Sequence, residues 1–205
     1  MAVTRFLLMR HAATAWNEEQ RIQGQRDVPL SPMGWEMARS WATALRDHEF
    51  QAVLSSDLRR ATETAGIVAQ GRNLPCVTDA RLREQDWGEW SGLPLAEITV
   101  LGQFTEQARQ GWDFRPPGGE SRREVLARSL DALEDAGRRW PGWSVLVVAH
   151  QGVIKCLVYH LQGHAMLPGS PLLGRDHWLH LLGLDGQGLH ILGAGWPLPE
   201  TAAVS

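Results

Sequence analysis

Four side chains that could bind or transfer an anionic group follow short apolar runs of this 205-residue chain. Arg10 and His11 come directly after FLLM, Arg60 shortly after AVL, and His150 directly after SVLVVA. Two arginines and two histidines brought together would form a compact pocket of positive potential. Such a pocket suits a phosphate or sulfate group better than a carboxylate, because three peripheral oxygens are available rather than two.

A carboxylic acid is also needed if this pocket is to catalyse a reaction as well as bind. The turn-rich stretch RLREQDWGEWSG supplies Glu84, Asp86 and Glu89. A carboxyl group at this place could protonate a leaving oxygen and then activate a water molecule. The residue types alone leave all three carboxylates as candidates for that role.

The composition excludes function classes that depend on a large charge. The net charge is -3 and 43% of the residues are hydrophobic, so neither nucleic acid nor an anionic membrane is an expected partner. Cys76 and Cys156 fit neither a zinc motif nor a disulfide framework, which favours a reducing compartment. The apolar run near the N-terminus is too short for a signal or membrane segment. We therefore expect a cytoplasmic protein.

A helix is expected where Ser31 can act as N-cap and Pro32 occupies the first helical position. The apolar residues that follow recur every fourth position, at Met33, Met37, Trp41 and Leu45. A second helix is expected after the AVL run, with Ala61, Ala65 and Val68 on one face. A third is expected after Ser121, with its apolar face formed by Val125, Leu126, Leu130 and Leu133.

Strands that alternate with helices predict a three-layer α/β/α sandwich with a mostly parallel sheet. The segment HWLHLLGLDGQGLHILG predicts a terminal hairpin, turning at Asp185 and Gly186, that adds one antiparallel edge strand. Residues 1–205 are interpreted as one domain. A small helical cap insertion is expected at about residues 92–118, with short helices around Ala96 and over 103–109. In such sheets ligands bind at the carboxyl ends of the strands, where the four cationic or ionisable residues would meet.

Six segments resemble the motifs of the histidine phosphatase superfamily, the phosphoglycerate-mutase-like proteins, in its larger branch. LMRHAATAWN is similar to the family's L-x-R-H-G-x-T-x-x-N, and RIQGQRDVPLSPMG to the stretch that follows it. SSDLRRATETA matches S-x-L-x-R-A-x-x-T-A, and LREQDWGEWSG resembles L-x-E-x-x-x-G-x-W-x-G. PPGGES and VLVVAHQGVIKCL complete the set in the same order.

The resemblance implies a phosphoryl-transfer site without a metal or cofactor. His11 would be the nucleophile and form a phosphohistidine, while Arg10, Arg60 and His150 would hold the transferring group. Glu84 would be the proton donor, with Asp86 or Glu89 as the alternatives. The ring nitrogen of His11 that does not attack should donate to a backbone carbonyl, which fixes the tautomer.

Further contacts to the phosphate or to the near part of the substrate are implied at Thr14, Asn17, Gln23, Gly24 and Gln151. The chain departs from the family pattern at two places. Ala12 stands where the family usually has Gly, which predicts either a negative φ there or a pocket floor that tolerates a methyl group. Gln151 replaces a frequent Gly, and the contact expected of it is through its backbone N–H.

The reaction expected is hydrolysis of a small phosphomonoester. Only 33 residues separate Glu84 from Gly118, whereas phosphoglycerate mutases of the family carry a longer, Arg-rich insertion there. A more open site admits water to the phosphohistidine. Mutase-type transfer and an inactive phospho-ligand binding module remain the alternatives. The substrate, among α-ribazole phosphate, sugar phosphates and phosphoglycerate, and a homodimeric state are left open.

Overall fold

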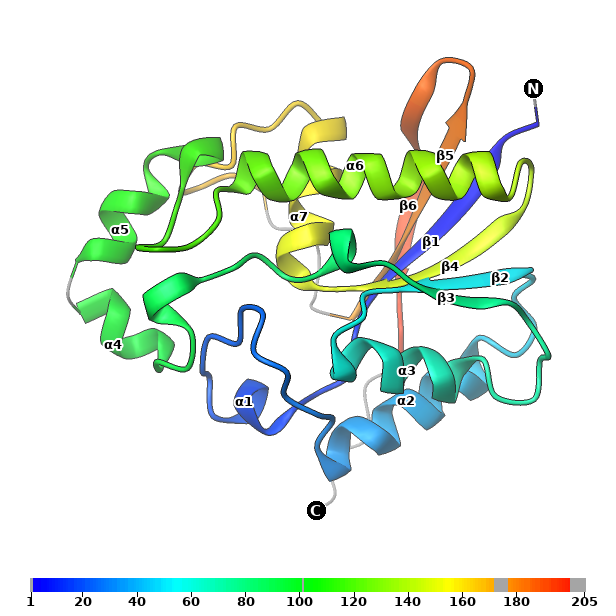
Figure 1. Ribbon diagram of the computed structural model, residues 1–205, viewed down its shortest axis with the longest axis horizontal. Helices are drawn as coiled ribbons and strands as arrows, with labels where there is room; N and C mark the ends of the chain where they lie inside the picture. The colour runs from blue at the N-terminus through cyan, green and yellow to red at the C-terminus, as the bar shows by residue number, and fades with distance from the viewer. Residues whose placement is uncertain (1, 101, 172–176, 200–205) are drawn as a thin grey trace.

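A six-stranded sheet forms the centre of the computed structural model, which describes residues 2–100, 102–171 and 177–199 (Figure 1). The strands are ordered β3-β2-β4-β1-β5-β6. Their bounds are β1 Thr4–Arg10, β2 Ala52–Ser55, β3 Cys76–Thr78, β4 Ser144–Ala149, β5 Trp178–Asp185 and β6 Gly188–Pro197. Strands β1 to β4 pair in parallel, and the predicted terminal hairpin is present. The hairpin supplies two strands: β5 runs antiparallel to β1, and β6 lies outermost.

Two helical layers cover the sheet, as the prediction of a three-layer sandwich required (Figure 1). Helices α2 (Pro32–Ala44) and α3 (Arg59–Val68) share one apolar cluster with Leu7 and Met9 of β1. Helices α6 (Arg122–Arg139) and α7 (Gln151–Leu161) share another with Phe6 and Leu8. Successive side chains of β1 therefore enter opposite cores, which explains why this strand is an unbroken apolar run.

The helix starts follow the sequence signals closely. The hydroxyl of Ser31 accepts the N–H of Gly34 with Pro32 in the first turn of α2, and Ser121 forms a capping box with Glu124 at the start of α6. The helix predicted from the four-residue recurrence is present, with Met37 and Trp41 buried and the side chain of Met33 50% exposed. At this point Gly34 faces inward instead: a Cβ on it would lie 1.9 Å from the Ala13 carbonyl oxygen, so the first turn is pressed against the loop after β1.

The expected helices of the cap region are present as α4 (Leu95–Val100) and α5 (Gln103–Ala108), beyond the short helix α1 (Ala15–Glu18) at one end of the molecule (Figure 1). They enclose a third, smaller apolar cluster, formed by Ile22, Trp87, Trp90, Leu93, Ile98, Phe104, Ala108 and Phe114. Three short 3-10 helices, at Ala80–Leu82, Gly88–Trp90 and Gly111–Asp113, belong to the long connection between β3 and α6. This connection carries the predicted proton donor.

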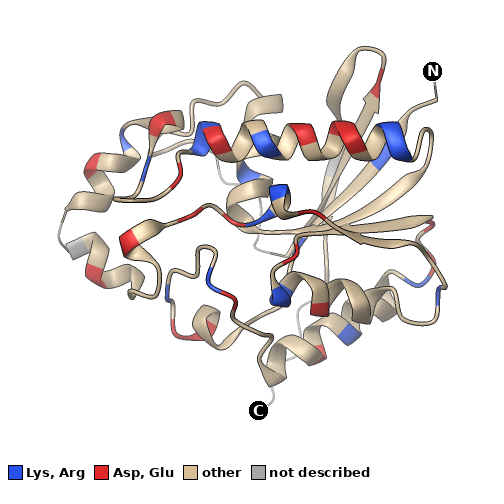
Figure 2. Cartoon of the chain, viewed as in Figure 1, with Lys and Arg blue, Asp and Glu red and all other residues tan. Residues whose placement is uncertain are grey.

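Charged residues are spread over the outer helices with both signs mixed (Figure 2). Along α6 the basic and acidic positions alternate in short groups, whereas the central strands carry few charges (Figure 2). Within the described ranges, no helix is both long enough and apolar enough to span a bilayer.

Candidate active site

His11 follows the last residue of β1 and is only 3% exposed. Its backbone N–H donates to the Ala149 carbonyl (3.0 Å), which continues the pairing with β4. The predicted tautomer-fixing bond is present, since Nδ1 lies 2.7 Å from the Ala12 carbonyl oxygen. Arg60 Nε lies 3.2 Å from the other ring nitrogen, Nε2. A guanidinium can only donate, so Nε2 must carry the lone pair and Nδ1 the proton.

Arg60 is completely buried although it carries a charge. It occupies the second position of α3, and its remaining two nitrogens donate to the carbonyls of Arg26 and Gly24, each at 2.8 Å. Gly24 adopts a left-handed conformation with φ +51°, where a Cβ would come within 2.7 Å of Ser91 Oγ. The loop after α1 is thus folded so that its carbonyls face the guanidinium and hold it beside His11.

Thr64 connects the loop after β1 to α3, a role that the sequence reasoning missed. Its hydroxyl donates to the Arg60 carbonyl (2.7 Å) and accepts the N–H of Ala12 (3.0 Å). The signal was available, because Thr64 is the threonine of the S-x-L-x-R-A-x-x-T-A pattern. Ala12 is fully buried and is not among the residues with positive φ, which agrees with the first of the two alternatives predicted from its replacement of Gly.

His150 lies at the N-cap of α7, directly after β4, with no exposed surface. Its ring centroid is 5.1 Å from that of His11. Within the described residues neither of its ring nitrogens has a hydrogen-bond partner. A buried polar group without a partner costs free energy, and a bound oxyanion would supply one. Arg10, the half-buried last residue of β1, adds positive charge at the same edge of the sheet.

Burial and neighbouring cations keep both histidines neutral. Desolvation, followed by the charges of Arg60 and Arg10, holds the pKa of His11 well below its usual value. The pKa of His150 is lowered in the same way, first by burial and then by Arg60. Burial also lowers the pKa of Arg60 to about 10, which leaves it cationic at neutral pH. A neutral imidazole can attack phosphorus, and a bound dianion would favour protonation of His150.

These two histidines predict a loss of stability in acid. Their pKa values are lower in the folded than in the unfolded chain, so the free energy of unfolding is unaffected well above pH 6.5 and falls as the pH decreases below it. Between pH 7 and pH 5 each histidine is expected to lower the free energy of unfolding, because the unfolded chain binds a proton there that the folded protein binds less readily. Urea unfolding of the ligand-free protein at both pH values measures this. His11→Asn and His150→Asn should each flatten the dependence, and an unchanged slope in both would contradict the argument.

Glu84 lies in the connection between β3 and α6, with both carboxylate oxygens bound to backbone. Oε1 accepts the N–H of Gln85 (2.8 Å) and Oε2 accepts the N–H of Gly152 in α7 (3.1 Å). Its own carbonyl accepts from Gln25 (3.2 Å) and from Arg128 of α6 (3.1 Å). The carboxylate is therefore held on the same helix that begins at His150.

Two arginines fix the segment around Glu84. Arg128 forms a half-buried ion pair with Glu120 (2.7 Å), which places its guanidinium beneath the segment. Arg83 binds both carboxylate oxygens of Asp57, in the turn between β2 and α3, at 2.8 and 2.6 Å. This hydrogen bonding from Arg83 lowers the pKa of Asp57. The segment around Glu84 is thereby joined to α6 in one helical layer and to the turn before α3 in the other.

The other two carboxylates of this segment are oriented differently. Asp86 accepts the N–H of Gly88 (2.9 Å) and so closes its own turn. Glu89 is exposed, on the 3-10 helix that follows. The neighbouring Trp87 stacks on Phe104 of α5 with 5° between the ring planes, which ties the segment to the cap. Of the three candidates, Glu84 is the one bound to the helix of His150.

The residues expected to contact substrate divide into two groups. Thr14 and Asn17 form a capping box at the start of α1, in which Asn17 Oδ1 accepts both the N–H and the hydroxyl of Thr14 at 3.0 Å. Gln23 is 8% exposed, and its Oε1 has no hydrogen-bond partner among the described residues. Gln151 is the half-buried first residue of α7. The hydrogen bonds of Thr14 and Asn17 fix the loop after His11. Gln23 Oε1 is still able to accept a hydrogen bond from a substrate.

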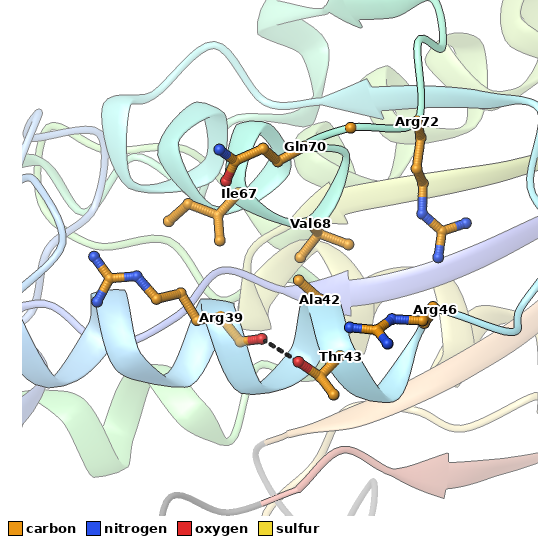
Figure 3. Close-up of a pocket in the computed structure, with 9 residues that line it drawn as sticks. Arg39, Ala42, Thr43, Arg46, Ile67, Val68, Gln70 and Arg72 are labelled. Carbon is orange, nitrogen blue, oxygen red and sulfur yellow. Dashed lines mark hydrogen bonds between the residues drawn. The ribbon is translucent and has the colours of Figure 1, made fainter.

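A separate arginine-lined groove lies between the C-terminal halves of α2 and α3 (Figure 3). Its volume is about 450 Å³, and Arg39, Arg46 and Arg72 are among its lining residues. Arg72 donates to the carbonyls of His48 and Leu45 and so provides hydrogen-bond donors for carbonyl groups at and beyond the C-terminal end of α2. The groove lies at the opposite end of α3 from the catalytic candidates, and neither a carboxylate nor a histidine lines it.

In the described ranges, no three or more His, Cys, Asp or Glu side chains are grouped so that they could hold a metal ion. The positive charge near His11 comes from guanidinium groups instead.

Comparisons with known proteins identify related sequences and structures. A curated relative from Mycolicibacterium vanbaalenii, named glucosyl-3-phosphoglycerate phosphatase, is 34% identical over 89% of this chain and 86% of its own. A probable phosphoglycerate mutase GpmB from Yersinia pestis is 37% identical over 76% and 74% of the two chains. The solved structure of a mycobacterial glucosyl-3-phosphoglycerate phosphatase in complex with VO3 has a TM-score of 0.82 at 30% identity, covering 95% and 99%.

The sequence profile of the histidine phosphatase superfamily (branch 1) matches residues 6–193, which include every catalytic candidate described above. By its profile, its relatives and its fold, this chain belongs to the histidine phosphatase superfamily.

Proposed function

We propose that this protein is a phosphomonoesterase that hydrolyses a small phosphorylated metabolite through a phosphohistidine on His11. The observation that carries the proposal is the state of that imidazole: neutral, with Nδ1 bound to a backbone carbonyl and Nε2 held against Arg60. The orphaned ring of His150, 5.1 Å away, supports a phosphoryl group bound between the two rings. The names of the curated relatives support the same reaction class.

In the first step the hydrogen bond from Arg60 Nε to His11 Nε2 breaks, and the freed lone pair on Nε2 attacks phosphorus and forms the N–P bond. The bond between phosphorus and the leaving oxygen breaks, and Glu84 gives its proton to that oxygen. Arg10, Arg60 and His150 stabilise the charge on the three equatorial oxygens. Guanidinium groups supply this charge without a metal, because positioning and electrostatics are the main requirements of phosphoryl transfer.

In the second step a water molecule attacks the phosphohistidine. Glu84, now ionised, accepts a proton from the water, the N–P bond breaks, and inorganic phosphate is released. The electron pair returns to Nε2, so the neutral tautomer of His11 is restored without any change at Nδ1. The carboxyl group of Glu84 thus acts as the general acid in the first step and as the general base in the second.

Two observations bear on the choice between hydrolysis and mutase-type transfer. The segment from Glu84 to Gly118 is short, and its described residues form the small helices α4 and α5 and two 3-10 helices. The relative that covers most of this chain at 34% identity is named a phosphatase of a sugar-bearing phosphoglycerate. We therefore place a phosphorylated sugar or sugar acid first among the substrate classes. Phosphoglycerate mutase-type transfer is the second candidate, because of the likeness to GpmB.

Turnover of p-nitrophenyl phosphate, unaffected by EDTA, is the expected result of the first assay. A panel of glucosyl-3-phosphoglycerate, sugar phosphates, α-ribazole 5′-phosphate and 3-phosphoglycerate then ranks the substrates by kcat/KM. Isomerisation of 3-phosphoglycerate faster than release of phosphate would replace the phosphatase by the mutase. Absence of turnover on every ester from pH 5 to pH 8 would favour a phospho-ligand binding module.

The cellular location and the assembly extend this proposal. Cys76 is exposed and Cys156 is buried, and both are free thiols, which supports a reducing compartment such as the cytoplasm. A homodimer stays a prediction, which analytical ultracentrifugation at micromolar concentration would test.

A further inference from the structure

The carboxylate of Glu84 lies directly over the α-carbon of Gly152. A Cβ built on Gly152 would be 2.2 Å from Glu84 Oε1 and 3.2 Å from its carboxyl carbon. Real side chains do not approach this closely, so any residue other than glycine must displace the carboxylate. The Gly152 N–H meanwhile donates to Oε2 at 3.1 Å. The position of the Glu84 carboxylate thus depends on Gly152 in two ways: the missing side chain leaves room for it, and the backbone N–H binds it.

Local helix structure gives no reason for a glycine at this place. Gly152 is the second residue of α7 and is not among the glycines with positive φ. Alanine is favoured over glycine in helices by about 0.5–1 kcal/mol. Gly66 in α3 is a useful contrast, because nothing lies within 4 Å of its Cβ position. The requirement at position 152 therefore comes from the approach of Glu84.

Helix α7 also lacks a side-chain cap of its own. His150, at its N-cap, makes no capping hydrogen bond, and the first unpaired N–H groups of a helix need acceptors. Glu84, separated from Gly152 by 68 positions in the sequence, provides one of them. The first turn of α7 thus carries His150 at its N-cap and, two residues later, Gly152, whose N–H binds the Glu84 carboxylate. The helix therefore fixes the position of the carboxylate relative to His150.

We infer that Gly152 is a positioning residue for the proton donor, holding the Glu84 carboxyl group where the leaving oxygen of the substrate will be. The inference rests on the proposed function, and specifically on Glu84 as general acid. Gly152 touches neither the phosphoryl group nor the nucleophile in this role. Its effect is transmitted through Glu84 alone, and this separates it from residues that merely support the fold.

Leaving-group dependence distinguishes such a role from a general loss of structure. An alkoxide needs a proton as it departs, whereas p-nitrophenolate is a weak base that leaves without one. General acid catalysis contributes about 10² to 10⁴ in rate where it is needed, and a displacement of about 1 Å can cost 10². Gly152→Ala should therefore lower kcat/KM for an alkyl phosphate by about 10²-fold and for p-nitrophenyl phosphate by less than about 5-fold.

The experiment is a double-mutant cycle on the full chain. Wild type, Gly152→Ala, Glu84→Ala and the double variant are assayed with p-nitrophenyl phosphate and with the best alkyl phosphate of the panel, and Gly66→Ala serves as the matched control. Once Glu84 is alanine, Gly152→Ala should cause no further loss on the alkyl ester. Equal losses on both esters, or losses that multiply in the double variant, would overturn the inference.

If Gly152→Ala folds poorly, the melting temperatures of the single and double variants provide the test instead. The clash exists only with the Glu84 side chain, so the double variant should then recover the stability of Glu84→Ala. Failure to recover it would refute the steric argument. A wild-type protein that hydrolyses neither ester contradicts the proposed function itself, whereas an active wild type with an unselective Gly152→Ala contradicts only the role of Gly152.

Discussion

Replacing His11 by alanine is expected to lower kcat/KM on every phosphomonoester by about 10⁴-fold or more, because it removes the covalent route altogether. His150, whose ring centroid lies 5.1 Å from that of His11, is not expected to take over the attack, because the proposed mechanism assigns this N-cap residue of α7 to the phosphoryl oxygens. Steady-state kinetics with p-nitrophenyl phosphate measures the loss directly.

Trapping of the intermediate provides the independent readout. Wild type quenched in alkali during turnover should carry an acid-labile phosphoryl group on the peptide that contains His11, and His11→Ala should carry none. His190→Ala, in the edge strand β6, is the matched control and should retain both turnover and labelling. A His11→Ala variant with more than a tenth of wild-type activity would exclude the proposed nucleophile.

Much of the fold and the position of the site could be predicted from the sequence, because both depend on local patterns. Apolar runs that end on Arg10, His11 and His150 predict buried parallel strands, and parallel strands bring their carboxyl ends to one edge of a sheet. The bond from Nδ1 of His11 to a backbone carbonyl follows from the chemistry required of a nucleophile. The roles of the catalytic residues stay predictions until the variants are assayed.

Other features depend on contacts between distant segments and leave no periodic signal. Strand β3 has three residues with no fully buried side chain, so its pairing with β2 is not visible in the hydrophobic pattern. The close approach of Gly34 to the Ala13 carbonyl likewise joins α2 to the loop after β1. The fit of Glu84 over Gly152 joins residues 68 positions apart. The requirement for glycine at position 152 comes from this contact, so it becomes visible only in the three-dimensional structure.

The second large effect is expected from Arg60→Lys, a change that preserves the charge. Arg60 distributes its guanidinium over three acceptors, namely His11 Nε2 and the carbonyls of Gly24 and Arg26. These acceptors lie in different directions, and a fully buried ammonium on a flexible stem cannot reproduce the planar fork that meets them. At least one buried carbonyl would lose its donor, at a cost of about 1–3 kcal/mol of stability.

Catalysis should suffer more than stability, because Nε2 of His11 would lose the donor that orients it and, in the proposed mechanism, the phosphoryl oxygens would lose the guanidinium as a donor. We expect kcat/KM to fall by about 10²- to 10³-fold, the usual cost of one preorganised donor in a transition state. Arg59→Lys is the matched control: the neighbouring side chain is 60% exposed and pairs with Glu63, so activity and melting temperature should hardly change. If Arg60→Lys kept a third or more of wild-type kcat/KM, charge alone would suffice at this position, and the geometric account of the guanidinium would have to be abandoned.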